Sequence, residues 1–261
     1  DVIHKKNKPE CIIALVGKYT SLSDSYLSVV EAIKHAAAAN QCDVIIRWVN
    51  SEHIESEGAN KFLSGCHGIL IPGGFGDRGI EGKIAAAKFA REQHIPYLGL
   101  CLGMHVACID FARHILKLKN AHSSEFNSKT PHPVIDILEH QKKIHKKGGT
   151  MRLGSYPCTV IEETLLHTAY NTVSINERHR HRYEFNNDYK SQFESKGMIF
   201  SGVSPDKKLV EVIELNSHPW FLACQFHPEF KSRPYKPHPL FNHFIENTLQ
   251  YTKETSNKVI V

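Results

Sequence analysis

The chain has 261 residues, 41% of them hydrophobic and 23% charged, which is the balance of a folded globular protein. These proportions exclude a disordered tail, a collagen-like chain and a coiled coil, and a net charge of +5 does not by itself indicate nucleic acid. No run approaches the roughly 20 apolar residues of a membrane-spanning helix, and the first residues carry no secretory signal. The seven cysteines form no C-x-x-C pair, so we expect reduced thiols, a cytoplasmic location and no zinc or thioredoxin motif.

Short apolar runs alternate with helical patterns in the first half of the chain. Strand-like runs cover 11–16, 44–49, 68–71 and 97–100, and helical spacing covers 26–37, 84–90 and 104–115. This alternation predicts a doubly wound, largely parallel α/β sheet. Ligands in such sheets bind beyond the carboxyl ends of the strands, which directs attention to Gly73-Gly74 and to Cys101.

The second half of the chain has a different pattern. Residues 117–150 are polar and rich in His and Lys, and only 134–138 are strand-like. Three further strands at 198–203, 209–215 and 220–226 are interpreted as antiparallel additions to the same sheet, and 239–251 as a closing helix. We therefore expect one domain in which 117–150 forms a long surface excursion.

A glycine-flanked cysteine, Gly99-Leu100-Cys101-Leu102-Gly103, follows the fourth predicted strand. The spacing is that of a nucleophile elbow with Cys in place of Ser. A thiol at a helix N-terminus is favoured as thiolate, and the Leu102 N–H would face a developing oxyanion. The alternative is a buried structural cysteine in a glycine-rich turn.

A thiol nucleophile requires a base and a group that orients the base. His227 and Glu229 stand two residues apart, directly after the strand predicted at 220–226. Histidine is the natural general base near neutral pH, and the carboxylate would fix its tautomer. With 18 histidines in the chain, this pair carries weight mainly together with Cys101.

Two other segments are candidates for binding. The glycine-rich turn at 72–79 lacks a P-loop pattern; it can cradle a phosphate, aim an N–H at an oxyanion or serve as a mobile lid. In the run 177–184, strand alternation would place Arg178, Arg180 and Arg182 on one face, able to hold a carboxylate. His179 and His181 would offer a metal two ligands, but no third follows at useful spacing.

These motifs together resemble the class I (triad) glutamine amidotransferases, and within them the glutaminase domain of the CTP synthase family. The most specific matching segments are G-G-T-M-R-L-G at 148–154 and E-R-H-R-H-R-Y-E at 177–184. The resemblance implies a three-layer α/β sandwich around a mixed, mostly parallel sheet, similar to flavodoxin. It also implies a linker remnant at 1–10, a glutaminase domain at 11–251 and a tail at 252–261.

The resemblance also implies a role for each matching residue. Cys101, His227 and Glu229 would form the catalytic triad. Gly74 and Leu102 would supply the oxyanion hole. The glutamine pocket would comprise Gly74, Leu102, Gly103, Met104, His105, Glu125 and Arg182, with Glu125 and Arg182 holding the α-amino and α-carboxylate groups. His105 departs from the family, in which Gln is frequent. A lid coupled to allosteric GTP would include Phe75, Gly76, Asp77, Arg78, Gly79 and Gly82.

The resemblance places this domain beside an N-terminal synthetase domain that uses Mg-ATP and UTP, in a homotetramer. The glutaminase domain itself would need no cofactor and no metal, and its substrate would be L-glutamine. The chain lacks that synthetase domain, so we expect a fragment that hydrolyses glutamine. Alternatives are another triad glutaminase, a γ-glutamyl hydrolase or Cys peptidase of similar fold, and a catalytically silent regulatory module.

Overall fold

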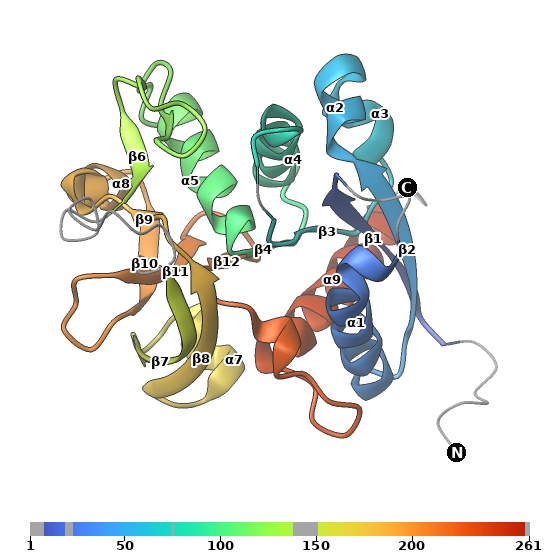
Figure 1. Ribbon diagram of the computed structural model, residues 1–261. Coiled ribbons are helices and arrows are strands. Elements are labelled where there is room, and N and C mark those ends of the chain that lie inside the picture. The colour runs from blue at the N-terminus through green and yellow to red at the C-terminus, as the bar shows by residue number, and fades with distance from the viewer. Residues whose placement is uncertain (1–7, 19–22, 75, 138–150, 259–261) are drawn as a thin grey trace.

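A computed structural model describes residues 8–18, 23–74, 76–137 and 151–258 of the protein. Its centre is a nine-stranded sheet with the strand order β2-β1-β3-β4-β12-β11-β10-β7-β8 (Figure 1). The strands are β1 (Glu10–Gly17), β2 (Asp43–Asn50), β3 (Gly68–Ile71), β4 (Tyr97–Leu100), β7 (Arg152–Val160), β8 (Ser174–His181), β10 (Met198–Val203), β11 (Val210–Leu215) and β12 (Phe221–Cys224). Pairing is parallel from β2 to β12 and antiparallel from β12 to β8. The mixed sheet predicted from the sequence is confirmed.

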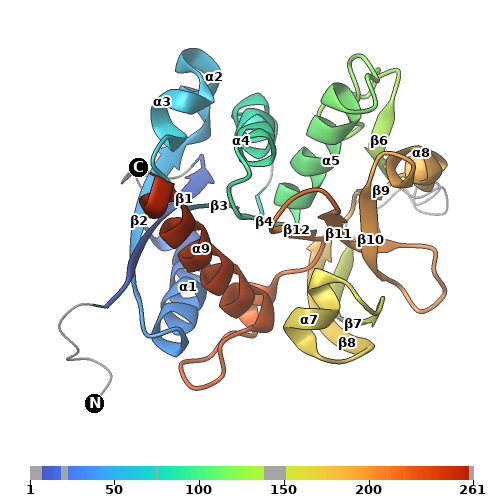
Figure 2. The ribbon, with the colours of Figure 1, turned by 180° about the vertical axis from the view of Figure 1, so that it is seen from behind.

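Helices cover both faces of the sheet, so the molecule has three layers (Figures 1 and 2). One face carries α2 (Ser51–Glu57), α3 (Ala59–Leu63), α4 (Ile80–Glu92), α5 (Leu102–His114) and α8 (Lys190–Glu194), and the other carries α1 (Leu27–Ala39), α7 (Leu165–Tyr170) and α9 (Pro239–Lys258). Alternation along β1 explains the two cores, because Ile13 and Leu15 point to one layer and Ala14 and Val16 to the other.

Short elements complete the fold. They are the 3-10 turns η1 (Ser23–Tyr26), η3 (Asn187–Tyr189) and η4 (Pro228–Phe230), and a small sheet of β5 (His122–Ser123), β6 (Pro133–Asp136) and β9 (Glu184–Phe185). This small sheet packs against α5 through Val134 and Ile135, both fully buried. The described part of the segment expected to be a surface excursion, 117–137, therefore contributes some residues to the core, and 138–150 lies outside the described residues.

The structure corrects two further expectations. The closing helix continues to Lys258 instead of ending at Tyr251, so most of the expected tail is helical. Strand β7 was not expected at all. It pairs in register with β8, for example Arg152 with His181 and Tyr156 with Glu177.

The position of β12 decides where the site forms. Although β12 comes late in the chain, it lies in the middle of the sheet and runs parallel to β4, with Cys224 opposite Leu100. The residues that follow the two strands therefore emerge side by side at the same edge. A hydrogen bond of 2.7 Å from the Cys101 N–H to the Cys224 carbonyl joins them directly.

Candidate active site

Cys101 lies in a sharp turn between β4 and α5. Its φ of 51° and ψ of −98° are unusual for a residue with a side chain and place it between strand and helix. The flanking glycines are required by close packing: a Cβ on Gly103 would lie 2.3 Å from the Ile71 carbonyl oxygen, and one on Gly99 would lie 2.7 Å from the Gly103 carbonyl carbon. Leu102 opens α5, so its N–H is one of the first-turn groups with no acceptor within the helix.

His227 and Glu229 follow β12 and reach the same place. The imidazole Nδ1 lies 2.8 Å from Glu229 Oε1, and both side chains are buried. Gly73 leaves room for the ring, because a Cβ there would lie 2.7 Å from His227 Cε1 and 3.6 Å from the Cys101 Cβ. The structure thus brings Cys101, His227 and Glu229 together from two separate turns, one after β4 and one after β12.

The charge state of His227 is set by its neighbours. Burial opposes its protonation, but hydrogen bonds and charge interactions with Cys101 and Glu229 outweigh burial and raise the pKa of His227 to about 10. The imidazole therefore holds its proton at neutral pH. Cysteine reacts as the thiolate, and a cationic imidazole is a typical neighbour of a reactive cysteine.

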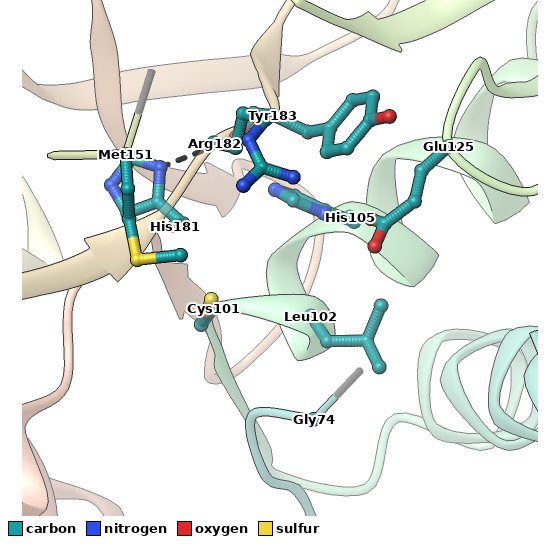
Figure 3. Close-up of a pocket in the computed structure, with 9 residues that line it drawn as sticks. All are labelled: Gly74, Cys101, Leu102, His105, Glu125, Met151, His181, Arg182 and Tyr183. Atoms are coloured by element: carbon teal, nitrogen blue, oxygen red, sulfur yellow. Dashed lines mark hydrogen bonds between the residues drawn. The ribbon is translucent and has the colours of Figure 1, made fainter. Parts of the chain in front are cut away.

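A pocket opens over Cys101, as Figure 3 shows. Cys101, Leu102 and Gly74 lie on one side of it, and Arg182, Tyr183 and Glu125 lie on the other. Its full lining is Gly74, Cys101, Leu102, His105, Glu125, Met151, His181, Arg182 and Tyr183. The sulfur thus faces a space bordered by both a carboxylate and a guanidinium.

Glu125 and Arg182 reach the pocket from different elements. Glu125 follows β5, where its N–H donates to Ser123 Oγ at 3.1 Å, and Arg182 follows β8. Burial raises the pKa of Glu125, and the charge of Arg182 opposes that shift. One negative and one positive group at the mouth of a pocket match the two charges of a free α-amino acid.

Some residues that the resemblance placed in the pocket do not line it. Met104 is fully buried in the core of the α5 layer, and Gly103 packs on Ile71 and accepts a hydrogen bond from the Tyr97 hydroxyl at 2.8 Å. Both therefore serve the elbow's packing. His227 and Glu229 lie outside the same lining and border a neighbouring cavity instead.

The expected lid separates into different parts. Asp77 and Arg78 are exposed, and Arg78 pairs with Glu52 at 3.4 Å. Gly82 does not belong to a lid, because it lies inside α4, where a Cβ would approach the Ser51 carbonyl oxygen to 1.8 Å. Gly79, the N-cap of α4, and Gly76 both have positive φ. Phe75 lies outside the described residues.

The Arg-His run forms β8, and its alternation is partly as expected. Arg178 and Arg180 share the exposed face, while Glu177, His179 and His181 are buried. Arg182 does not share the face of the other arginines, because the strand ends at His181 and the chain turns into the pocket. Among the described residues, no group of three or more His, Cys, Asp or Glu side chains is arranged to hold a metal ion.

Beneath the pocket, Arg152 anchors a buried charged network. Its guanidinium contacts Glu211 Oε1 at 2.8 Å and Glu184 Oε1 at 3.2 Å. His179 Nδ1 and His181 Nε2 lie 2.8 Å apart, and burial lowers the pKa of both histidines. Burial also raises the pKa of Glu184, to about 8. This network fixes the strand from which Arg182 extends.

Sequence reasoning gave no role to Met151, Tyr183 and Gln225, and it considered His181 only as a possible metal ligand. Met151, His181 and Tyr183 stand inside segments already singled out, at 148–154 and 177–184, so proximity to a specific motif was the available signal. Gln225 immediately precedes Phe226 and His227, and nothing in its residue type or spacing identifies it as a site residue.

In the described part of the chain, no helix has the length and apolarity needed to cross a membrane.

Comparison with known proteins gives consistent matches. The family model for glutamine amidotransferase class-I matches residues 21–247. A CTP synthase from Caldanaerobacter subterraneus subsp. tengcongensis is 57% identical over 251 residues, which are 95% of this chain and 47% of that protein. One from Moorella thermoacetica is 60% identical over 233 residues, 89% of this chain and 43% of that protein. The chain thus spans about half the length of the curated relatives it matches.

Solved structures match over nearly the whole chain. The glutaminase domain of Trypanosoma brucei CTPS with bound acivicin is 38% identical, with a TM-score of 0.86, and the match covers 92% of this chain and 94% of that one. A glutamine amidotransferase from Thermotoga maritima has a TM-score of 0.53 at 11% identity and covers 92% of this chain and 96% of that one. The second match supports only the assignment of the fold.

Proposed function

This chain belongs to the class I glutamine amidotransferases, and within them to the glutaminase domains of CTP synthases, and from this premise we propose that Cys101, His227 and Glu229 hydrolyse L-glutamine. The observation that carries the proposal is the pairing of β12 with β4, which sets His227 and Glu229 beside a strained cysteine at a pocket. Hydrolysis at such a site needs no cofactor, because thiol, imidazole and water supply every reacting group.

The first half-reaction transfers the acyl group to sulfur. The Cys101 thiolate attacks the side-chain amide carbon of glutamine, and the carbonyl oxygen becomes an oxyanion. The N–H groups of Gly74 and Leu102 hold that oxyanion; one such donor is typically worth about 2.7–4 kcal/mol of barrier. When the C–N bond breaks, His227 gives its proton to the leaving nitrogen, so ammonia departs and a γ-glutamyl thioester remains.

The second half-reaction returns the enzyme to its starting state. His227, now neutral, takes a proton from water, and the resulting hydroxide attacks the thioester carbon. Collapse of this intermediate releases glutamate and restores the thiolate beside protonated His227. Glu229 keeps the Nδ1 side of the ring fixed in both steps, so Nε2 always faces the reacting atoms.

Substrate selection follows from the charges at the pocket mouth. We assign the α-amino group to Glu125 and the α-carboxylate to Arg182, which border the pocket across from Cys101 (Figure 3). His105 lines the same pocket from the first turn of α5. A γ-glutamyl hydrolase or a Cys peptidase of similar fold would not need to hold a free α-amino group in this way.

The test is alkylation by a diazo-ketone analogue of glutamine, read by intact mass, with acivicin as a second probe. We expect a single adduct on Cys101 that excess glutamine prevents and that Cys101→Ser abolishes. Glutamate release by the protein before alkylation, and its loss after alkylation, confirms turnover. An adduct on another cysteine, or labelling that glutamine does not slow, would refute the assignment.

The use of the ammonia extends the proposal. Since the relatives are about twice as long, we propose that a synthetase domain of the same polypeptide consumes it, aminating UTP to CTP with Mg-ATP in a cytoplasmic homotetramer. GTP would act through the loop Gly76–Gly79. In the full-length protein, CTP formation from glutamine should vanish in Cys101→Ser while CTP formation from added ammonia persists.

A further inference from the structure

A side chain outside the triad also contacts the proposed nucleophile. Gln225 stands between β12 and His227; it is fully buried, and its N–H donates to the Glu211 carbonyl at 2.8 Å. Its side-chain Nε2 lies 3.7 Å from Cys101 Sγ, within hydrogen-bond range for sulfur. The triad mechanism assigns this contact no role.

The orientation of the Gln225 amide is set by His105. His105 Nε2 lies 2.9 Å from Gln225 Oε1, and the imidazole is buried in the first turn of α5. Burial lowers the pKa of His105 to about 4, against the opposing effect of this hydrogen bond, so the ring is neutral at physiological pH. Because an amide oxygen only accepts, Nε2 must carry the proton of the neutral ring and donate it to Oε1.

The hydrogen bond from His105 fixes which end of the Gln225 amide faces the sulfur. With Oε1 held by His105, the NH₂ group of Gln225 faces the sulfur and can only donate to it. A donor beside the sulfur stabilises the thiolate more than the thiol, since hydrogen bonds to an ionised acceptor are about twice as strong. The contact therefore acts in the same direction as protonated His227.

We propose that Gln225 is a second thiolate-stabilising donor to Cys101, and that His105 is the positioning residue that holds the Gln225 amide in the donating orientation. The proposal rests on the proposed function, because it takes Cys101 as the nucleophile. It also gives His105 a definite role: its side chain offers an N–H to Gln225 Oε1.

Other charged or titratable groups also face Cys101, and the test must leave them in place. They are His227 and Glu229 beyond β12, Cys224 within β12, His181 at the end of β8, and Glu125 and Arg182 across the pocket. The informative variants therefore change only Gln225 or His105.

The experiment measures the rate at which iodoacetamide alkylates Cys101 as a function of pH, with the adduct located by peptide mass. Gln225→Leu removes the donor, and His105→Leu removes the group that orients it. His105→Gln is the matched control, because its amide can still donate to Gln225 Oε1. We expect both Leu variants to shift the alkylation midpoint upward by about one pH unit, equivalent to about a tenfold loss of thiolate below the midpoint, and His105→Gln to keep the wild-type midpoint.

Glutamine kinetics separate this role from a structural one. In Gln225→Leu, which changes no residue of the pocket lining, loss of the donor should lower kcat about tenfold with little change in KM, whereas a distorted pocket would raise KM and leave the alkylation midpoint in place. Should Gln225→Leu fail to fold, the two His105 variants decide alone. An unchanged midpoint in His105→Leu, or equal shifts in His105→Leu and His105→Gln, overturns the proposal. A wild-type protein that hydrolyses no glutamine contradicts only the proposed function, because the midpoint is read without substrate.

Discussion

Cys101 occupies a backbone conformation that residues other than glycine rarely adopt. Such residues cost of order 1–3 kcal/mol each and persist where the surrounding structure holds them. Here the holding groups are the β4–β12 pairing, the packing of Gly99 and Gly103, and the hydrogen bond from Cys101 N–H to Cys224. The strain presents the sulfur at the end of a helix, where an attacking group must be exposed to substrate.

This strain predicts a difference between two inactive variants. Cys101→Ala and Cys101→Gly both abolish glutamine hydrolysis, but only glycine relieves the backbone. We expect Cys101→Gly to exceed Cys101→Ala in free energy of unfolding by about 1 kcal/mol, the strain relieved less the flexibility that glycine adds to the unfolded chain. Urea denaturation of the two proteins measures it. Equal stabilities would mean that the turn carries no strain.

Two adjacent glycines should respond differently to alanine. In Gly73→Ala the new Cβ would lie 2.7 Å from His227 Cε1, so the imidazole must move. In Gly74→Ala the nearest atoms lie 3.6 Å and 3.7 Å away, which is ordinary contact. We expect Gly73→Ala to lose about 10²-fold in kcat, the scale of a 1 Å misplacement, and Gly74→Ala to keep most activity. Steady-state glutamine hydrolysis compares the two variants. A larger loss in Gly74→Ala would contradict the conclusion that Gly73, and not Gly74, makes room for the His227 ring.

At the scale of elements, α2 and α4 lie in close contact through Gly82. Because a Cβ on Gly82 would overlap the Ser51 carbonyl oxygen, Gly82→Ala must push the two helices apart. Overpacking of this kind costs about 1–3 kcal/mol, and we expect that loss in chemical denaturation. Lys88→Ala, a partly exposed change on the same helix, should stay within about 0.5 kcal/mol of wild type. A tolerated Gly82→Ala would show that α4 can shift freely.

The elements found from sequence and those missed differ in what they bury. The strands at 68–71 and 97–100 were predicted to the residue, because every position is buried and apolar. Strand β7 was missed and β8 was read only conditionally, because their inward faces carry Arg152, Glu177, His179 and His181 in place of aliphatic side chains. A hydrophobic period cannot reveal a strand whose buried side chains are polar. The same limit hid Gln225, whose contact with Cys101 exists only through the β4–β12 pairing.

Considered as a whole, the molecule buries several neutral histidines, and this sets its response to acid. Burial lowers the pKa of His105 and His218 to about 4 and that of His179 to about 3, and it lowers the pKa of His181 as well. Between the ordinary value near 6.5 and these lowered values, the unfolded chain binds more protons than the native one. Their contribution to stability is therefore complete above pH 6.5 and is lost as the pH falls toward 4.

A pair of variants tests this pH dependence away from the site. His218 is buried beside α4, where its Nε2 donates to the Ala90 carbonyl at 3.1 Å, while His53 is exposed. Each buried neutral histidine changes the free energy of unfolding by up to about 1.4 kcal/mol per pH unit between its native and its unfolded pKa. Urea denaturation at pH 7, 6 and 5 should show a shallower acid loss in His218→Gln than in wild type. The control His53→Gln, a change at an exposed position, should follow wild type, and parallel curves for all three proteins would contradict this explanation.

The late position of β12 has a consequence for how the protein is made. A ribosome completes β4 long before it reaches residues 221–224, the strand that lies between β4 and β11. Until then β4 presents an unpaired edge, which invites pairing with other chains. The cysteine emerges more than 120 residues ahead of its base, so the nascent chain carries a thiol without the imidazole that activates it. The order of synthesis therefore keeps the Cys101 thiol without its activating base until β12 has been made and inserted into the sheet.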